Sequence, residues 1–306
     1  MRTYRPPCSR SMAAFLFRTR SKDMYDFWKM TPGGNPTILL KAEDFPPQIR
    51  ASVANAVMDS QHIGAEQVGY VRLSGTPRLD MMGGEFCLNA TRSFALLLAE
   101  RGLLAQEGDV LTGRVEVSGV SSDVAVRVLK QRNGLPFAEA CLHFSDLPMP
   151  EDFPGGLRLV RVPGIAHILQ EGPLPGEKLL PEFCERQRLL CGVAAEEAVG
   201  HMWLSSVESA APDVAEAELR PVVWVRDTGS LCNESACGSG TLACALALHA
   251  EKGCTHCTIR QPSGHCLSVR MEKTAGGWDI WVGGPVRMTA SGKTDLTGLP
   301  GGVHTL

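Results

Sequence analysis

The chain has 306 residues and a formal net charge of −3, with 44% hydrophobic and 21% charged residues. This composition is typical of a globular protein with one large domain or two ordinary ones, and the weak charge implies no nucleic-acid partner. No apolar run in the sequence reaches the ~20 residues that a membrane-spanning helix needs. The 11 cysteines are scattered rather than densely spaced, which favours a reducing, cytoplasmic setting.

Residues 1–23 differ from the rest of the chain. They carry six basic residues and a single acid, Asp23, and their apolar stretch is too short for the core of a signal peptide. We therefore interpret 1–23 as an N-terminal extension ahead of the fold.

A first half-domain is expected over 24–150. Its hydrophobic pattern and its Gly, Pro and Asn clusters predict two strands around a turn at 31–36, one helix over 46–62 and a second helix that begins at Cys87. Further strands are predicted at 68–73, 79–82, 115–117, 124–128 and 138–144.

A second half-domain is expected over 151–284, after a linker at 148–156 that is rich in proline and glycine. The order of the first half is repeated here. A helix is predicted over 181–190 and another begins at Cys237. Strands are predicted at 199–204, 221–225, 257–260, 266–271 and 278–282.

Two cysteine motifs match across the halves. Cys87 and Cys237 each open an apolar helix-forming run, with a threonine four residues later and an alanine eight residues later. Neither run has a polar face, so each helix is expected to be buried on all sides. The predicted fold class is α+β, with two pseudo-symmetric halves, each a β-sheet wrapped around a central α-helix, and the active site between them.

A cysteine at a helix N-terminus lies beside free backbone N–H groups, which favour a thiolate and bind carboxylates. Two such thiols suit removal of a proton from one face of a carbon and its return to the other face, one acting as general base and the other as general acid. The helix N-termini would stabilise the developing charge without a cofactor. Asn35 and Asn89 are candidates to bind the amino-acid head group, although turn formation alone also explains them.

The motifs from about 24 to 292 resemble the cofactor-independent diaminopimelate epimerase family. The resemblance implies a diaminopimelate epimerase-like fold, two catalytic cysteines (Cys87 and Cys237), no metal and no cofactor. It also implies that a last strand, near 285–292, returns to the first half. The matching segments are 29–35, 62–69, 87–90, 236–240 and 283–286.

The sequence departs from the diaminopimelate epimerases where they bind the distal end of the substrate. Ile165 and Ala198 occupy the positions of two asparagines that serve this purpose in the family. The motif that precedes Cys237 is also changed and longer. The proton-transfer machinery is thus expected to remain while the distal carboxylate site is lost.

The chain is most similar to the branch of histidine racemases that supply D-histidine for opine metallophores. One departure cuts against activity: Leu88 stands where the family has a glycine after the first cysteine, and its bulk is expected to crowd the carboxylate site or to narrow the substrate range. Glu66 is the expected partner of the imidazole or amino group. The substrate-binding residues that the resemblance implies, with the cysteines as acid and base, are Asn35, Glu66, Gln67, Leu88, Asn89, Glu234, Gly238 and Ser239.

Alternatives remain at this point. A diaminopimelate epimerase with an altered pocket, or a racemase of another amino acid, would use the same thiols. A metal-binding or redox protein would use cysteines without catalysis, for which a Cys/His-rich stretch with Cys254-x-x-Cys257 at its centre is the candidate. The expected partner is a small amino-acid substrate, and a homodimer is compatible with the sequence.

Overall fold

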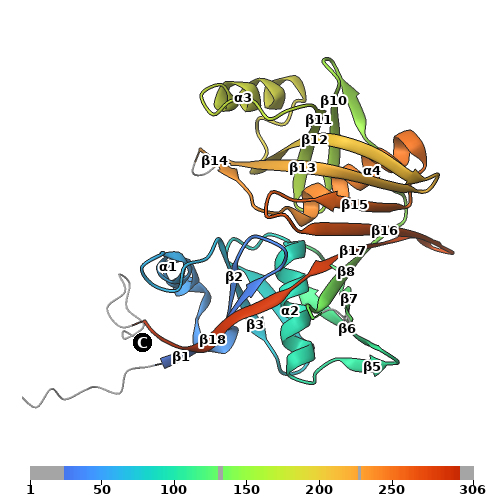
Figure 1. Ribbon diagram of the computed structural model, residues 1–306. Coiled ribbons are helices and arrows are strands. Elements are labelled where there is room, and N and C mark those ends of the chain that lie inside the picture. The colour runs from blue at the N-terminus through green and yellow to red at the C-terminus, as the bar shows by residue number, and fades with distance from the viewer. Residues whose placement is uncertain (1–23, 130–133, 227–228, 297–306) are drawn as a thin grey trace, which may run out of the picture.

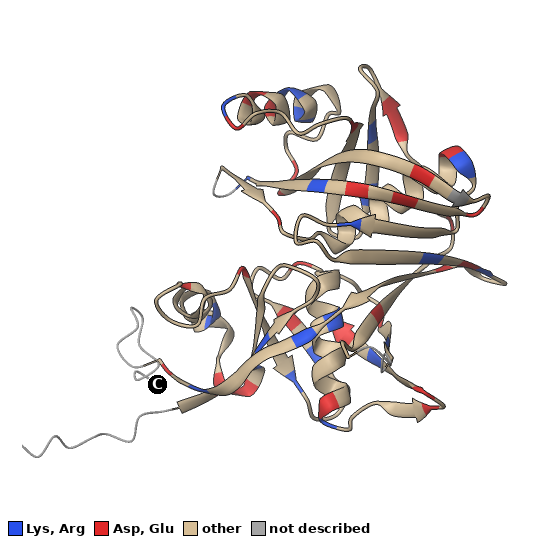
Figure 2. Ribbon diagram, in the orientation of Figure 1, with Lys and Arg blue, Asp and Glu red and all other residues tan. Residues whose placement is uncertain are grey.

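The computed structural model describes residues 24–129, 134–226 and 229–296 (Figure 1). The extension 1–23 lies outside the described residues. The described residues form a sheet of 18 strands and four α-helices, divided into two halves that lie one above the other in Figure 1. Acidic and basic residues are interspersed along the ribbon of both halves (Figure 2).

In the first half, the sheet curls around helix α2 (Leu88–Glu100), and helix α1 (Pro47–Met58) covers its outer face beside the short helix η1 (Ala42–Asp44). Strand β5 (Ala105–Glu107) pairs with β6. The other strands follow in the order β18 (Arg287–Asp295), β1 (Met24–Thr31), β2 (Thr37–Lys41), β3 (Gln67–Arg72), β4 (Arg78–Met81), β6 (Val110–Val117), β7 (Val124–Leu129) and β8 (Phe137–Phe144).

In the second half, the sheet curls around helix α4 (Gly238–Lys252), and helix α3 (Leu180–Leu190) packs outside it. Strand β14 (Ser230–Asn233) pairs with β13. The remaining strands follow in the order β17 (Gly277–Pro285), β16 (Cys266–Thr274), β15 (His256–Arg260), β13 (Val214–Val225), β12 (Ala198–Ala211), β11 (Ile165–Glu171), β10 (Leu157–Val162) and β9 (Glu151–Phe153).

Two strand pairings join the halves. Strand β17 pairs with β8 of the first half over nearly its whole length, from Trp278 opposite Phe144 to Pro285 opposite Phe137. The chain then enters β18, which lies antiparallel to β1 in the first half. The second half is therefore held to the first along the sheet as well as through the contacts between their helices.

The central helices are buried on all sides, as their sequences predicted. In α2 every residue from Leu88 to Leu98 is buried, and in α4 nearly every residue from Gly238 to Leu248 is buried. Both helices contribute to one hydrophobic cluster that runs through the two halves. Because each helix is enclosed by a sheet, its first residue is held in a fixed place relative to the surrounding strands.

The strand predictions hold in position but not always in extent. Strands β12 and β13 extend well beyond the predicted 199–204 and 221–225. The outer portion of β13 alternates buried with less buried residues, and both outer portions include acidic residues that weaken a hydrophobic strand pattern. The predicted linker 148–156 contains β9, a short edge strand paired with β10. Strands β5, β10 and β14 were not predicted; two of them are only three or four residues long.

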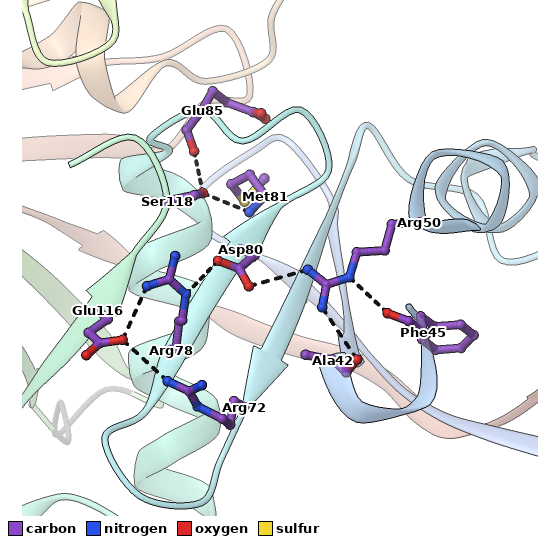
Figure 3. A network of polar contacts seen from close by, with 10 residues as sticks. All are labelled: Ala42, Phe45, Arg50, Arg72, Arg78, Asp80, Met81, Glu85, Glu116 and Ser118. Carbon is purple, nitrogen blue, oxygen red and sulfur yellow. Dashed lines mark hydrogen bonds and ion pairs between the residues drawn. The ribbon is translucent and has the colours of Figure 1, made fainter. Parts of the chain in front are cut away.

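A polar network fixes the segment that leads to Cys87 (Figure 3). Asp80 on β4 accepts hydrogen bonds from Arg78 at 2.7 Å and from Arg50 of α1 at 3.4 Å. Ser118, just after β6, accepts from the Met81 N–H at 2.9 Å and donates to the Glu85 carbonyl at 2.7 Å. Through Ser118, the loop between β4 and α2 is thus hydrogen-bonded to the segment that follows β6.

Gly119 allows the chain after β6 to pass close to this loop. Its φ is +78°, and a Cβ built there would lie 2.3 Å from the Phe86 nitrogen and 2.8 Å from the Glu85 carbonyl carbon. Both the backbone conformation and the space therefore require glycine at this position.

We expect Gly119→Ala to lower the free energy of unfolding by about 3 kcal/mol or more, because it adds overlap with backbone to the strain of a positive φ. Gly108→Ala is the matched control, with φ +61° and nothing within 4 Å of the added carbon, and should cost about 1 kcal/mol. Urea denaturation of both variants measures the difference. Equal losses would contradict the close approach of Gly119 to the Phe86 backbone.

Candidate active site

Cys87 is the N-cap of α2. Its backbone is extended, with φ −130° and ψ 109°, and its sulfur accepts a hydrogen bond from the Ala90 N–H at 3.4 Å. The Cys87 carbonyl accepts from the backbone N–H of Thr91 at 2.9 Å and from its hydroxyl at 2.8 Å. The thiol is therefore held at the positive end of the helix dipole.

Cys237 caps α4 with the same geometry. Its φ is −129° and its ψ is 107°, and the Gly240 N–H donates to the sulfur at 3.3 Å. Thr241 again donates to the cysteine carbonyl, from its hydroxyl at 2.6 Å. The threonine four residues after each cysteine thus has one structural role in both halves, which explains the repeated spacing in the sequence.

The two helix starts abut one another. A Cβ built on Gly238 would lie 2.9 Å from the Leu88 Cβ and 3.0 Å from the Asn89 Oδ1, so only glycine fits here without movement of its neighbours. Leu88 is 2% exposed, and it is buried against Gly238. Asn89 donates from Nδ2 to the Ala236 carbonyl at 3.2 Å. These contacts bring together five of the predicted site residues from opposite halves: Leu88, Asn89 and Gly238, with Cys87 and Cys237 as the helix caps.

Asn35 makes a second connection between the halves. Its Oδ1 accepts hydrogen bonds from the Ser235 hydroxyl at 3.0 Å and from the Ala236 N–H at 3.1 Å. Its own N–H donates to the Ser235 oxygen at 2.8 Å. The φ of Asn35 is +47°, a conformation that asparagine tolerates, so this residue forms the turn and orders the approach to Cys237.

A glutamine side chain forms a hydrogen bond with each cysteine. Gln67 donates to the Thr37 hydroxyl at 2.7 Å, and its Oε1 accepts from the Cys87 thiol at 3.2 Å. Gln261 accepts from the Cys237 N–H at 3.0 Å and donates to the Thr241 hydroxyl at 3.0 Å. Gln67 was predicted as a site residue. Gln261 was not, because its position at the start of a Gln-Pro-Ser-Gly hairpin indicates a turn and gives no sign of its contact with a distant cysteine.

Two carboxyl groups lie at the approach to Cys237. The exposed Glu66 accepts from the Ser235 hydroxyl at 3.4 Å. The half-buried Glu234 hydrogen-bonds with Cys237 and Asn35. Burial raises the pKa of Glu234 to about 7; the charge of Glu66 adds to this rise, and the bonds to Cys237 and Asn35 oppose it. Partial desolvation of the Glu66 carboxyl group also raises its pKa, against the Ser235 hydrogen bond.

Burial dominates the acidity of both thiols. It raises the pKa of Cys87 to about 11, against the Ala90 N–H, and the charges of Glu85 and Glu234 raise it further. It also raises the pKa of Cys237, where the Glu234 carboxylate acts in the same direction and the Ser239 hydroxyl, 3.6 Å from the sulfur, opposes it. In this arrangement a thiolate forms only where a compensating charge is available.

Apolar residues occupy the two positions where the sequence lacks the asparagines that bind the distal end of the substrate in diaminopimelate epimerases. Ile165 starts β11 and packs partly buried against the central hydrophobic cluster, while Ala198 starts β12 opposite Val225. The Gly164 before Ile165 approaches Phe86, with 3.8 Å between its built Cβ and the Phe86 nitrogen. This corner of the second half therefore lies next to the loop that carries Cys87.

The Cys/His-rich stretch does not assemble a metal site. In β15 His256 is exposed and Cys257 is buried, as alternation along a strand requires. Within 24–129, 134–226 and 229–296, no three His, Cys, Asp or Glu side chains gather closely enough to hold a metal ion. In the same ranges, no helix is long and apolar enough to cross a membrane.

Sequence comparison identifies the family. The family model described as histidine racemase CntK N-terminal domain matches residues 24–294. The chain belongs to the histidine racemase family. A histidine racemase of Fusobacterium nucleatum subsp. nucleatum is 30% identical over 278 residues, which are 90% of this chain and 97% of that protein. A histidine racemase of Staphylococcus aureus is 25% identical, over 89% of this chain and 98% of that protein.

Solved structures agree on the fold. A phenazine biosynthesis protein of the PhzF family from Bacillus anthracis has a TM-score of 0.59 at 14% identity, covering 89% of this chain and 98% of its own. A hydroxyproline epimerase from Agrobacterium vitis, with bound trans-4-hydroxy-L-proline, has a TM-score of 0.59 at 12% identity, covering 90% and 94%. The predicted diaminopimelate epimerase-like fold is confirmed, and the protein is an isomerase of the amino-acid racemase class.

The raised pKa of Glu234 predicts a pH-dependent stability. Its folded pKa of about 7 exceeds the unfolded value near 4.5, so the folded protein binds more protons between these values and loses stability as pH rises through them. We expect Glu234→Gln to remove this loss, roughly 1–3 kcal/mol, and thus to gain stability relative to the parent from pH 4.5 to pH 8. Denaturant unfolding at several pH values measures it; a constant difference between the two proteins would refute the raised pKa.

Proposed function

We propose that the protein is a cofactor-independent histidine racemase that interconverts L- and D-histidine. The observation that carries the proposal is the pair of matched cysteine caps, Cys87 and Cys237, on helix starts that abut at Leu88 and Gly238. The names of the relatives, which match almost their whole length, support histidine as the substrate.

In the proposed reaction one cysteine acts as a thiolate and the other as a thiol. The thiolate takes the proton from Cα, and the electrons of the broken C–H bond form a carbanion delocalised into the carboxylate. The thiol on the opposite face gives its proton to Cα and becomes the thiolate. One proton is taken and one is given, so the enzyme ends with the roles of Cys87 and Cys237 exchanged, and the reverse reaction uses the same groups.

The helix N-termini supply the stabilisation that the weakly acidic Cα–H requires. The first-turn N–H groups of α4, at Gly238 and Ser239, and that of Leu88 on α2 have no carbonyl partner within their own helices. In the proposed complex they bind the α-carboxylate, where charge increases as the proton leaves. No metal or cofactor is needed for this step.

Polar groups around Ser235 are suited to the rest of the substrate. Asn35 and Gln67 are proposed to bind the amino-acid head group, beside Asn89. Glu66 presents a carboxyl group beside Ser235 and Glu234 presents one beside Cys237, and the pKa of about 7 at Glu234 is close to that of an imidazole. Because the two groups have similar pKa values, the Glu234 carboxyl group can form a hydrogen bond with the imidazole of the substrate at neutral pH.

The proposed cellular location follows from the reduced state that the cysteines require. The cysteines in 24–129, 134–226 and 229–296 are all free, and both catalytic thiols must stay reduced to act. We therefore propose a reducing, cytoplasmic location. The D-histidine product suits the supply of a D-amino acid for opine-type metallophore biosynthesis, as the resemblance implied. The homodimer stays a prediction.

Replacement of either cysteine by serine tests the two-thiol reaction. Because a serine hydroxyl is a far weaker acid than a thiol, we expect Cys87→Ser and Cys237→Ser each to lower racemisation at least a hundredfold, at the low end of about 10²–10⁴ for acid–base catalysis. Each variant should still exchange Cα–H for deuterium in one enantiomer only, opposite for the two variants. Cys141→Ser, outside the site, is the control. Full racemisation by either single variant would refute the two-thiol reaction.

Substrate choice is tested with an amino-acid panel. Ile165 and Ala198 provide no polar partner for a second amino-acid end, and such missing partners are worth on the order of 10⁴ in discrimination. We expect turnover of both histidine enantiomers and little or none of diaminopimelate, measured by chiral chromatography. Efficient epimerisation of diaminopimelate without action on histidine would assign the protein to the diaminopimelate epimerases instead.

Glu66→Gln separates substrate binding from folding. We expect it to weaken histidine turnover about tenfold or more through loss of a charge-assisted hydrogen bond, with little change in thermal melting because Glu66 is exposed. Glu43→Gln, on the outer helix η1, is the control for loss of one acidic charge. Unchanged kinetics in Glu66→Gln would remove Glu66 from the substrate site.

A further inference from the structure

Gln261 is a buried glutamine that directly follows strand β15, and only 3% of its surface is exposed. Its Oε1 accepts from the Cys237 N–H at 3.0 Å, while its Nε2 donates to the Thr241 hydroxyl at 3.0 Å. Nε2 also donates to the Ile259 carbonyl at 3.1 Å, so both of its hydrogens are used. Because the nitrogen must face that carbonyl, the orientation of the amide is fixed with its oxygen toward Cys237.

These bonds form a closed ring around Cys237. The Thr241 hydroxyl, which accepts from Gln261, donates to the Cys237 carbonyl at 2.6 Å. The peptide groups on both sides of the Cys237 Cα are thus held, the N–H by Gln261 and the carbonyl by Thr241. Since these two groups determine φ and ψ of the cysteine, the ring fixes the direction in which its side chain leaves the backbone.

The hairpin that begins with Gln261 also holds the segments around the site. The Ser263 N–H donates to the Ser235 carbonyl at 3.0 Å, and its hydroxyl donates to the Gly33 carbonyl. Ser235 lies two residues before Cys237, and Gly33 belongs to the turn of the first half that carries Asn35. One hairpin therefore holds the second cysteine in a fixed position relative to the turn proposed to bind the amino-acid head group.

The first half holds its cysteine by different contacts. Ser118 after β6 is the counterpart of Gln261 after β15, because each strand follows the central helix of its half and pairs in parallel with a strand that precedes this helix. Ser118 donates to the Glu85 carbonyl at 2.7 Å, two residues before Cys87. The glutamine beside Cys87 is Gln67, which contacts the sulfur rather than the backbone. The two caps thus match in conformation but not in what holds them.

We propose that Gln261 is a positioning residue that fixes the direction of the Cys237 sulfur for proton transfer at Cα of the substrate. It acts through the backbone of Cys237 and not by contact with the substrate. The inference rests on the two-thiol reaction proposed above and adds a residue that serves one of the two thiols. Loss of Gln261 impairs proton transfer at Cys237 and leaves transfer at Cys87 intact.

Amide hydrogen exchange measured by NMR tests the contact without substrate. In the unaltered protein the Cys237 amide should be strongly protected, because its N–H is buried and hydrogen-bonded. Gln261→Met keeps a side chain of similar length but leaves that N–H without its acceptor. Exchange of the Cys237 amide should then become about tenfold faster or more, relative to the amide of Thr91. The Thr91 N–H is the reference because it donates to the Cys87 carbonyl at 2.9 Å in the matched helix start.

Gln187→Met is the matched control. Gln187 is also buried, at 4% exposure, and its Oε1 bonds to His201 on the outer side of the second half. Its loss should lower stability without changing the ratio of the Cys237 and Thr91 exchange rates. Equal acceleration of these two amides in Gln261→Met would overturn the proposal. So would rapid exchange of the Cys237 amide in the unaltered protein, a result that does not depend on the folding of any variant.

Deuterium exchange at Cα of histidine resolves the effect for each cysteine. In Cys87→Ser, where Cys237 is the remaining thiol, adding Gln261→Met should lower the exchange about tenfold or more, because misplacement of a reacting group is costly. In Cys237→Ser the same addition should change the exchange by less than about twofold, because Gln261 then serves no reacting group. Equal losses in the two backgrounds would overturn the proposal. A protein with the expected amide exchange but no action on histidine would refute the proposed function alone.

Discussion

The contact between the starts of α2 and α4 is the constraint on which the rest of the molecule depends. Gly238 lies against Leu88 with no room for a side chain, and each helix is enclosed by its own half of the sheet. The sheets therefore hold the helix axes, and the helix caps hold the thiols. Strands β17 and β18, which pair with β8 and β1 of the first half, keep the two halves together around this contact.

The site combines symmetric backbone with asymmetric charge. The caps at Cys87 and Cys237 agree within 2° in φ and ψ, with φ −130° and −129° and ψ 109° and 107°. A reaction that runs in both directions through mirror-related substrates requires such matching. The surrounding groups do not match, because the Cys87 thiol donates to the uncharged Gln67 while the Glu234 carboxyl group hydrogen-bonds with Cys237.

Local features of the sequence were sufficient to predict the helices and both caps. Thr91 and Thr241 repeat because each satisfies the carbonyl of its own cysteine, a contact within one turn of helix. Contacts between distant segments could not be predicted in this way. Gln261 reaches Cys237 from a hairpin 24 residues away, and Arg92 on α2 donates to the Pro32 carbonyl of the 31–36 turn. Edge strands such as β9 are too short to show a pattern.

The presence of leucine rather than glycine at position 88 has a structural explanation. The side chain is buried against the start of α4, so it belongs to the contact between the halves as well as to the edge of the proposed carboxylate site. Gly238 and Leu88 fill one space between the two halves. The combined volume of the two residues is limited there, and the absence of a side chain at Gly238 leaves room for the bulky residue after the first cysteine.

The most direct test of two opposed thiols is the fate of the Cα proton in the unaltered enzyme. L-histidine is converted in deuterium oxide, and substrate and product are separated early and analysed by mass spectrometry. Two bases on opposite faces predict D-histidine that carries one deuterium at Cα, while the remaining L-histidine is unlabelled. Product that retains the original hydrogen, or label that enters substrate and product equally from the start, would show a single base and contradict the account.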